Sequence, residues 1–321
     1  MYHLSPNLTL GILNFESYAY LESLFFSVLN QTDKRFNVLI IDNGSRDGSW
    51  RLIQNFSNTF RSANPESEIK IIRNSQNSFS LQGTKSLLEN CTTPYVSVVH
   101  SDDILADNFV ETALEIIEKY PTVSAFNVEL IEINEVGQTT GKNLKSNWSC
   151  NDFINKLLVC GLNPGVMPGS ILNISFVKPF VTQEFPLQMN GNEDTLLWQT
   201  IIRNNGSIRQ IPVATYFYRR HRGQTTNSSD AFAYSLGYSR RFNIEKAANK
   251  FQRLLALSEV KYEMNYVVND NYLKGLGLDR SLQRYSLLRP LSIAIRRFAS
   301  LINQLCSAQF VSRIKKKIQR F

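Results

Sequence analysis

Residues 95–103 read Tyr-Val-Ser-Val-Val-His-Ser-Asp-Asp, and they indicate the fold class of the chain. Its first five residues form a short apolar, β-branched run that is typical of a strand covered on both faces of a parallel sheet. Pro94 precedes the run, and a turn is expected directly after it. The stretch therefore predicts an open α/β sheet, in which ligands bind just outside the carboxyl ends of the strands.

Two adjacent carboxylates, Asp102 and Asp103, stand at the end of that predicted strand. Neighbouring carboxylates repel each other unless a cation lies beside them. A hard divalent ion, Mn²⁺ or Mg²⁺, held by oxygen ligands and carrying a phosphorylated substrate, would satisfy both groups. The alternative is that Asp102 or Asp103 caps a helix that begins near Leu105. The residues alone leave both interpretations open.

Three further strands are predicted ahead of this one, over residues 8–13, 36–41 and 69–72, with helices over 18–30 and 79–90 and another running through Trp50. This alternation fits right-handed parallel βαβ units. Asn14, Asp42 and Arg73 follow the strands, so we expect them to meet Asp102 at one edge of the sheet. A plain turn at Asp42 is the alternative. The chain has no glycine-rich phosphate loop, so a nucleotide here would be held by a metal and side chains.

Taken in order, the motifs resemble those of family 2 glycosyltransferases with the GT-A fold. The matching segments are residues 13–16, 27–32, 41–49, 73–74, 93–103, 168–170, 192–194 and 218–221. The resemblance spans roughly residues 6–228. It implies an α/β fold, a Rossmann-like GT-A domain with a mostly parallel central sheet flanked by helices. It also implies an inverting, metal-dependent transfer from a nucleotide-diphosphate sugar, most often UDP-linked.

Carried over by position, the resemblance implies a donor-binding set of Asn14, Glu16, Asp42, Arg73, Ser101, Asp103, Arg220 and Arg222. Within that set Asp42 would accept a hydrogen bond from the nucleobase. Guanidinium groups bind phosphate oxygens in pairs, so the arginines near residue 220 would suit a diphosphate. A solvated basic loop is the alternative for that segment.

The resemblance also implies a metal site formed by Asp102, with Asp103 and His221 as further candidate ligands. His100 stands where the commonest form of the family motif has Asp. The second metal or ribose contact is therefore open: Asp103 could share the role, and His100 could bond the ribose or simply pack. The expected cofactor is Mn²⁺ or Mg²⁺.

Inverting transfer needs one base to deprotonate the acceptor hydroxyl. Glu193-Asp194 resembles the family pair that supplies it, and Asp194 is favoured over Glu193. The alternative is structural, because acidic residues are stabilised in the first turn of a helix. The loop with Pro168, Gly169 and Ser170 would border the donor sugar and acceptor, with a plain connector as its alternative.

Composition supports one large domain with an appendage, since the chain has 321 residues and is 43% hydrophobic. We expect a catalytic domain over 1–228, with a nucleotide-binding half near 1–104 and an acceptor half near 105–228. A helical extension would cover 229–321. Four cysteines without C-x-x-C spacing fit a reducing compartment, and neither a secretory leader nor an apolar spanning run is evident. A cytoplasmic location follows as an expectation.

Charge is concentrated at the end of the chain. Residues 284–321 hold nine Lys and Arg and no Asp or Glu, while the whole chain carries +8. An apolar stripe from Leu287 to Leu305 accompanies these charges, so this segment could lie on an anionic membrane surface. Packing on the catalytic domain is the alternative. No nucleic-acid-binding module is recognisable.

The sequence thus predicts a glycosyltransferase that moves a sugar from a nucleotide-diphosphate donor to a glycan or lipid-linked acceptor, in surface polysaccharide synthesis. Two alternatives remain from other classes. A metal-dependent nucleotidyltransferase would share the sheet and metal, but it usually carries a glycine-rich basic loop after the first strand, and residues 14–17 lack one. A catalytically degenerate GT-A fold serving as a binding subunit has only His100 in its favour.

Overall fold

The computed structural model describes residues 6–77, 79–144, 165–184, 193–224 and 229–246. The chain divides into two compact units. The first comprises residues 1–146, 166–191 and 206–227, and the second comprises 147–165, 192–205 and 228–321. The domain boundary expected at residue 228 stays a prediction.

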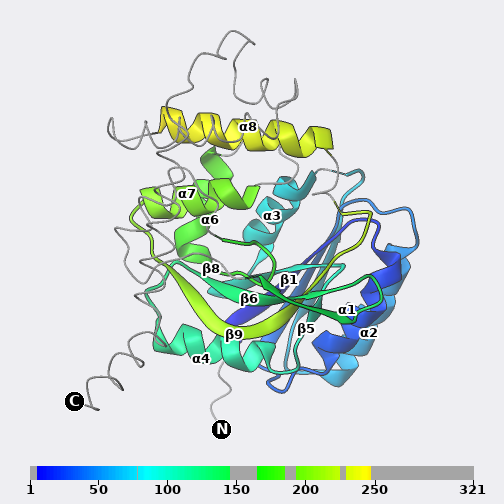
Figure 1. Ribbon diagram of the computed structural model, residues 1–321. Coiled ribbons are helices and arrows are strands. Elements are labelled where there is room, and N and C mark those ends of the chain that lie inside the picture. Colours follow the sequence, from blue (N-terminus) through cyan, green and yellow to red (C-terminus); the bar gives the residue numbers. More distant parts are fainter. Residues whose placement is uncertain (1–5, 78, 145–164, 185–192, 225–228, 247–321) are drawn as a thin grey trace, which may run out of the picture. The chain divides into compact units, whose positions relative to one another are not determined.

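The first unit is built on one sheet with the strand order β3-β2-β1-β4-β8-β6-β9-β5, to which β7 is added beside β6 (Figure 1). The strands are β1 (Leu8–Asn14), β2 (Phe36–Asp42), β3 (Ile69–Arg73), β4 (Tyr95–His100), β5 (Ile104–Leu105), β6 (Ala125–Ile133), β7 (Thr139–Leu144), β8 (Ile171–Asn173) and β9 (Ile208–Arg219). β3, β2, β1 and β4 run parallel, as do β6 and β9. β8 joins the two groups by antiparallel pairing with β4 and β6.

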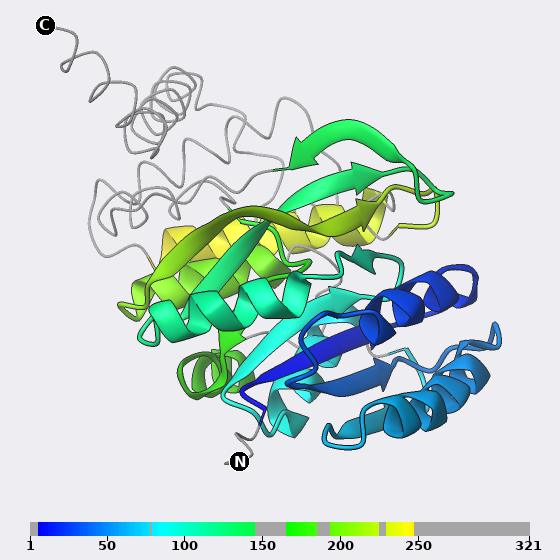
Figure 2. The ribbon, with the colours of Figure 1, turned by 90° about the horizontal axis from the view of Figure 1, so that it is seen from below.

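Helices cover both faces of this sheet, as Figures 1 and 2 show. α1 (Tyr18–Leu29), α2 (Ser49–Ala63) and α4 (Phe109–Lys119) share one apolar core with the sheet. α3 (Phe79–Asn90) and α6 (Ile174–Glu184) lie on the other face. A Cβ on Gly11 of β1 would come within 2.2 Å of Leu87 Cδ2 and 2.9 Å of Val96 Cγ2, so a larger residue there would force the Leu87 side chain of α3 to move.

The α/β fold and the first four strands predicted from the sequence are confirmed, each observed strand ending one residue later than expected. One alternative is wrong. Asp102 and Asp103 do not cap a helix near Leu105, because Ile104 and Leu105 form β5 and α4 begins only at Phe109 after Asn108. β5 pairs with β9, which ties the segment after Asp103 to a strand more than one hundred residues later.

The second unit is described by α7 (Glu193–Arg203) and α8 (Ser229–Glu245). Residues 195–202 of α7 are all buried, and the Arg203 guanidinium lies 5.8 Å from the centre of the Phe242 ring. Among the described residues, no helix is both long and apolar enough to cross a membrane. The segment 284–321, predicted to bind membranes, lies outside the described residues.

Candidate active site

The carboxyl ends of β1, β2 and β3 bring Asn14, Asp42 and Arg73 side by side. Asn14 stands opposite Asp42 in the strand register, and Asp42 stands opposite Arg73. Asn14 Nδ2 donates to Asp42 Oδ1 at 2.7 Å, and Arg73 Nε lies 3.3 Å from Asp42 Oδ2. The convergence of these three side chains, expected from the strand order, is confirmed. We call them, with Ser45, the nucleoside cluster.

Ser45 connects this cluster to the loop after β1 through two hydrogen bonds. Its hydroxyl donates to Asp42 Oδ1 at 2.6 Å and accepts from the backbone N–H of Glu16 at 2.9 Å. Glu16 has a φ of 48°, a left-handed conformation that costs energy for a residue with a side chain. Gly48 is the N-cap residue of α2, and Asp47 accepts from the backbone N–H of Ser49.

Two buried oxygens of the nucleoside cluster, Asn14 Oδ1 and Asp42 Oδ2, accept no hydrogen bond from the residues that the structure describes. Asp42 Oδ2 keeps only its ion pair with Arg73. Buried acceptors without a donor are unfavourable and uncommon in folded proteins. The cluster therefore fits a bound group that offers an N–H donor, as a nucleobase does.

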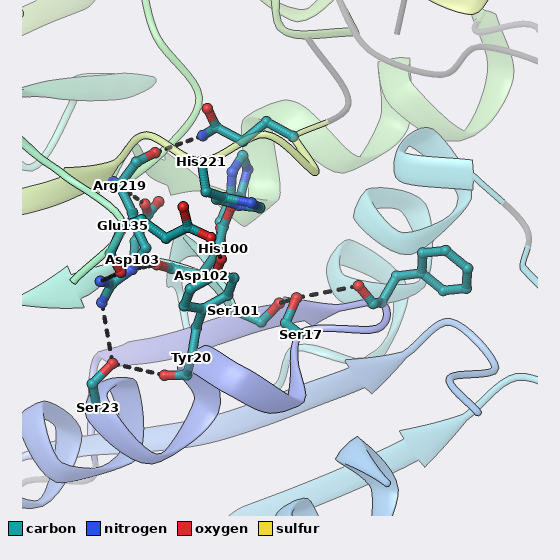
Figure 3. A network of polar contacts seen from close by, with 12 residues as sticks. Ser17, Tyr20, Ser23, His100, Ser101, Asp102, Asp103, Glu135, Arg219 and His221 are labelled. Atoms are coloured by element: carbon teal, nitrogen blue, oxygen red, sulfur yellow. Dashed lines mark hydrogen bonds and ion pairs between the residues drawn. The ribbon is translucent and has the colours of Figure 1, made fainter. Parts of the chain in front are cut away.

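The turn after β4 gathers the groups that could hold a cation. One ligand atom each from His100, Asp102 and Asp103 lies within 4.8 Å of the others. His221, beyond the end of β9, adds to this group, because its Nε2 lies 2.9 Å from Asp102 Oδ2 (Figure 3). Imidazole nitrogens and carboxylate oxygens both bind divalent transition ions, so the residues fit a metal centre. We call these four residues the cation cluster.

Asp102 is the carboxylate of this cluster best suited to bind an ion. Burial raises the pKa of Asp102, but its hydrogen bond with His221 and the charges of His100 and His221 outweigh that effect, and the net shift is downward. The side chain keeps 18% of its surface exposed. An ionised, accessible carboxylate is what cation binding requires.

Asp103 is held differently, inside the protein. It is fully buried, Oδ2 accepts from the Tyr216 hydroxyl at 2.7 Å, and Oδ1 accepts from the backbone N–H of Arg219 at 2.8 Å. Burial, and then the charge of Asp102, raises the pKa of Asp103 well above its usual range. Asp103 thus anchors β9 to the turn after β4, and its predicted contacts with metal or donor stay predictions.

Arg219 is one of the residues of this site that sequence reasoning missed. Its Nε donates to the carbonyl of Asp102 at 2.6 Å, and its terminal nitrogens donate to the Glu135 carbonyl at 2.8 Å and to Ser23 Oγ at 3.2 Å. Only 3% of Arg219 is exposed. One guanidinium therefore joins the turn after β4, helix α1 and the β6–β7 hairpin (Figure 3).

Tyr20 of α1 contacts the same network from the other side. Its ring centre lies 4.7 Å from that of His221 and 5.0 Å from the Arg219 guanidinium. Its hydroxyl donates to Glu135 Oε1 at 3.2 Å. The His221 ring is therefore held between the Tyr20 ring and the Asp102 carboxylate.

The remaining residues assigned to the donor lie near the network with other partners. The Ser101 hydroxyl donates to Ser17 Oγ at 2.8 Å. Arg220 Nε pairs with Glu132 Oε2 at 3.1 Å, while Arg222 is exposed. The predicted contacts of Arg220 and Arg222 with a diphosphate stay predictions.

The loop assigned to the acceptor side is hydrogen-bonded to strand β4 of the sheet. Gly169 N–H donates to the Val98 carbonyl at 2.7 Å, and Val98 N–H donates to the Ser170 carbonyl at 2.9 Å. Gly169 has a φ of 73°, and a Cβ there would come within 2.7 Å of the Tyr216 ring. Pro168, Gly169 and Ser170 are buried, and their contact with an acceptor stays a prediction.

The residues predicted to be catalytic belong to the second unit. Glu193 is the first residue of α7, and Asp194 accepts from the backbone N–H of Thr195 at 2.7 Å. Asp194 therefore does occupy a first helical turn, where a carboxylate is stabilised. Its role as a base stays a prediction.

The sequence profile described as glycosyl transferase family 2 matches residues 9–174, which include the nucleoside cluster and three of the four cation-cluster residues. An uncharacterized glycosyltransferase of Haemophilus influenzae is 24% identical over 233 residues, covering 69% of this chain and 68% of the relative.

Solved structures share the fold at low sequence identity. TarS 1-349 of S. aureus, in complex with UDP-GlcNAc, aligns with a TM-score of 0.64 and 15% identity over 84% of this chain and 79% of that one. The match covers only 44% of the longer TarS chain. The mannosyltransferase PcManGT of Pyrobaculum calidifontis, in complex with GDP-Man and Mn²⁺, aligns with a TM-score of 0.57 and 13% identity over 94% of this chain and 88% of that one.

Proposed function

Because this chain belongs to glycosyl transferase family 2, and is thus a glycosyltransferase, we propose that it moves a sugar from a UDP-linked donor to a glycan or lipid-linked acceptor with inversion. Synthesis of a surface polysaccharide is the proposed setting. The UDP-GlcNAc complex of TarS supports the uridine donor, whereas the GDP-Man complex of PcManGT makes a guanosine donor the competitor to test.

The observation that carries the proposal is that the nucleoside and cation clusters lie on adjoining strand ends. β1 runs between β2 and β4, with Asn14 opposite Asp42 on one side and Leu13 opposite His100 on the other. A nucleoside diphosphate has a base with hydrogen-bonding groups at one end and negative phosphates at the other. The two clusters offer complementary chemistry in that order.

Asp102 and His221, with His100 or Asp103, would hold Mn²⁺ or Mg²⁺. When bound, the ion would neutralise charge on the departing diphosphate. Arg219 would support this metal site and would not contact the diphosphate, because its guanidinium is buried and donates to the carbonyl of Asp102. Arg73 is exposed and would face the base or phosphates, from a position in which it pairs with Asp42 and donates to the Ser45 carbonyl at 2.8 Å.

Asp194 is proposed as the base that takes the proton from the attacking acceptor hydroxyl, with Glu193 as the second candidate. A carboxylate stabilised in a first helical turn is a weak base. The adjacent carboxylate and loss of water on substrate binding would both raise its proton affinity.

A nucleotide-release assay tests the proposal. The full chain is incubated with a panel of UDP- and GDP-sugars, in Mn²⁺, in Mg²⁺ and with chelator. We expect release of nucleotide from one or a few UDP-sugars, dependent on the ion and increased by an acceptor. Release that is indifferent to chelator, or confined to GDP-sugars, would overturn the corresponding part of the proposal.

We also propose that residues 284–321 hold the enzyme on the cytoplasmic face of the cell membrane. The support is the nine-to-zero excess of basic over acidic residues in this segment, joined to its apolar stripe. Such a location would bring the enzyme to the membrane that carries a lipid-linked acceptor.

A further inference from the structure

We propose that the metal ion of this enzyme is held by two imidazoles, those of His100 and His221, together with the carboxylate of Asp102. The centre would therefore select a first-row transition-metal dication over Mg²⁺. The inference rests on the proposed function, because it concerns the ion that accompanies the nucleotide. It decides between the two ions that the sequence left open.

His100 is placed as a ligand by the end of β4. Its backbone N–H donates to the Tyr216 hydroxyl at 3.1 Å, and that hydroxyl donates to Asp103. This bond fixes the backbone on which the imidazole stands. A ring nitrogen then lies within 4.8 Å of carboxylate oxygens from both Asp102 and Asp103, a spacing that one shared ion can bridge.

His221 reaches the same carboxylate from the segment after β9. Its Nε2 lies 2.9 Å from Asp102 Oδ2, and its ring packs on Tyr20. The side chain of His221 keeps 11% of its surface exposed, and that of Asp102 keeps 18%. They are thus held in place by the protein and still open to an ion.

Fewer carboxylates are available to a metal ion at this centre than the sequence implies. Both oxygens of Asp103 already accept hydrogen bonds, from Tyr216 and from the backbone of Arg219, and the side chain is fully buried. Asp102 is left as the accessible carboxylate of the cluster. Mg²⁺ prefers oxygen ligands and water, whereas imidazole favours the transition ions, so two imidazoles shift the preference away from Mg²⁺.

Pulsed electron paramagnetic resonance of Mn²⁺ bound to the full chain with UDP tests the ligand set. The chain has three histidines, so His3→Gln is a matched control. We expect two imidazole nitrogens coupled to Mn²⁺ in the wild type and in His3→Gln, and one in each of His100→Asp and His221→Gln. His100→Gln removes the same nitrogen without adding a charge, and should also leave one.

Ion selectivity provides the second readout. The ratio of Mg²⁺ to Co²⁺ dissociation constants, measured with UDP present, should fall roughly tenfold or more in His100→Asp, while that variant still binds UDP with metal. An unchanged nitrogen count or an unchanged ratio would overturn the inference and leave the proposed function standing. Failure of every ion to strengthen UDP binding by the wild type would overturn both.

Discussion

At the scale of single residues, the cation cluster depends on neighbouring side chains that hold its candidate metal ligands in position. The ring of Tyr20 packs on His221, and its hydroxyl bonds to Glu135. Groups that orient a metal ligand commonly affect metal affinity as strongly as a weak ligand does. Tyr20 is therefore a positioning residue for the cation cluster.

Replacement of Tyr20 separates the two contacts. Tyr20→Leu removes the ring and should weaken Mn²⁺ binding roughly tenfold, because His221 loses its support. Tyr20→Phe keeps the ring and loses only the bond to Glu135, so it should retain most of the affinity. Equilibrium binding of Mn²⁺ in the presence of UDP measures both variants. Equal losses would show that the hydroxyl, and not the ring, is what matters.

Residues such as Asp42 and Asp102 could be assigned from the sequence because each follows a recognisable strand. Arg219 and Tyr216 could not, because their partners Asp102 and Asp103 lie more than one hundred residues away and no local pattern marks the contact. The sequence signal near residue 219 was only basic density. That signal led to Arg220 and Arg222, which turn out to be partnered elsewhere or exposed.

At the scale of elements, Asp47 connects two helices. Its Oδ2 accepts from the backbone N–H of Tyr18, at the start of α1, and its Oδ1 accepts from that of Ser49, at the start of α2. Burial opposes ionisation, but these hydrogen bonds outweigh it and lower the pKa of Asp47. One carboxylate thus satisfies orphan donors at two helix N-termini.

Asp47→Ala should lower the free energy of unfolding by about 1–2 kcal/mol at pH 7, as loss of a helix cap does. Because the folded pKa is depressed, this contribution is fully present above the ordinary Asp pKa of about 3.9 and is lost as the pH falls from there through the lower folded pKa. The gap between wild type and variant in urea unfolding should therefore narrow at acid pH. A gap that stays constant from pH 7 to pH 3 would contradict the assignment.

Helix α7 carries the candidate base. Asp194→Asn should lower kcat by roughly 10²-fold or more, the usual contribution of a general base, while donor binding stays near that of the wild type. Glu193→Gln is the matched control. An active Asp194→Asn together with an inactive Glu193→Gln would reverse the two roles, and two active variants would make the site structural.

The strands differ in how well they could be predicted from the sequence. β1, β2 and β4 are buried along most of their lengths, so apolar runs marked them within one residue. β5 is two residues long and exists only through its pairing with β9, and no run of that length carries a pattern. Because no local pattern marks β5, Asp102 and Asp103 before it were also compatible with the cap of a helix.

At the scale of the whole molecule, the basic C-terminal segment sets the proposed location. Each Lys or Arg near an anionic surface contributes about 1 kcal/mol, so several together should give salt-sensitive binding with an apolar, salt-resistant remainder. Truncation before Arg284 should release the protein from anionic vesicles in a flotation assay, without loss of transfer to a soluble acceptor analogue. Equal flotation of full-length and truncated chains would show that the segment is not an anchor.

We propose that the two clusters at one sheet edge bind the nucleotide and its metal separately. Calorimetric titration of UDP into the full chain, in Mn²⁺ and in chelator, tests it most directly when the wild type is compared with Asp102→Asn and Asp42→Ala. We predict that Mn²⁺ strengthens binding to the wild type, that Asp102→Asn loses this gain but matches the wild type in chelator, and that Asp42→Ala is weaker in both conditions. The same gain from Mn²⁺ in Asp102→Asn, or an unchanged affinity in Asp42→Ala, would contradict the account.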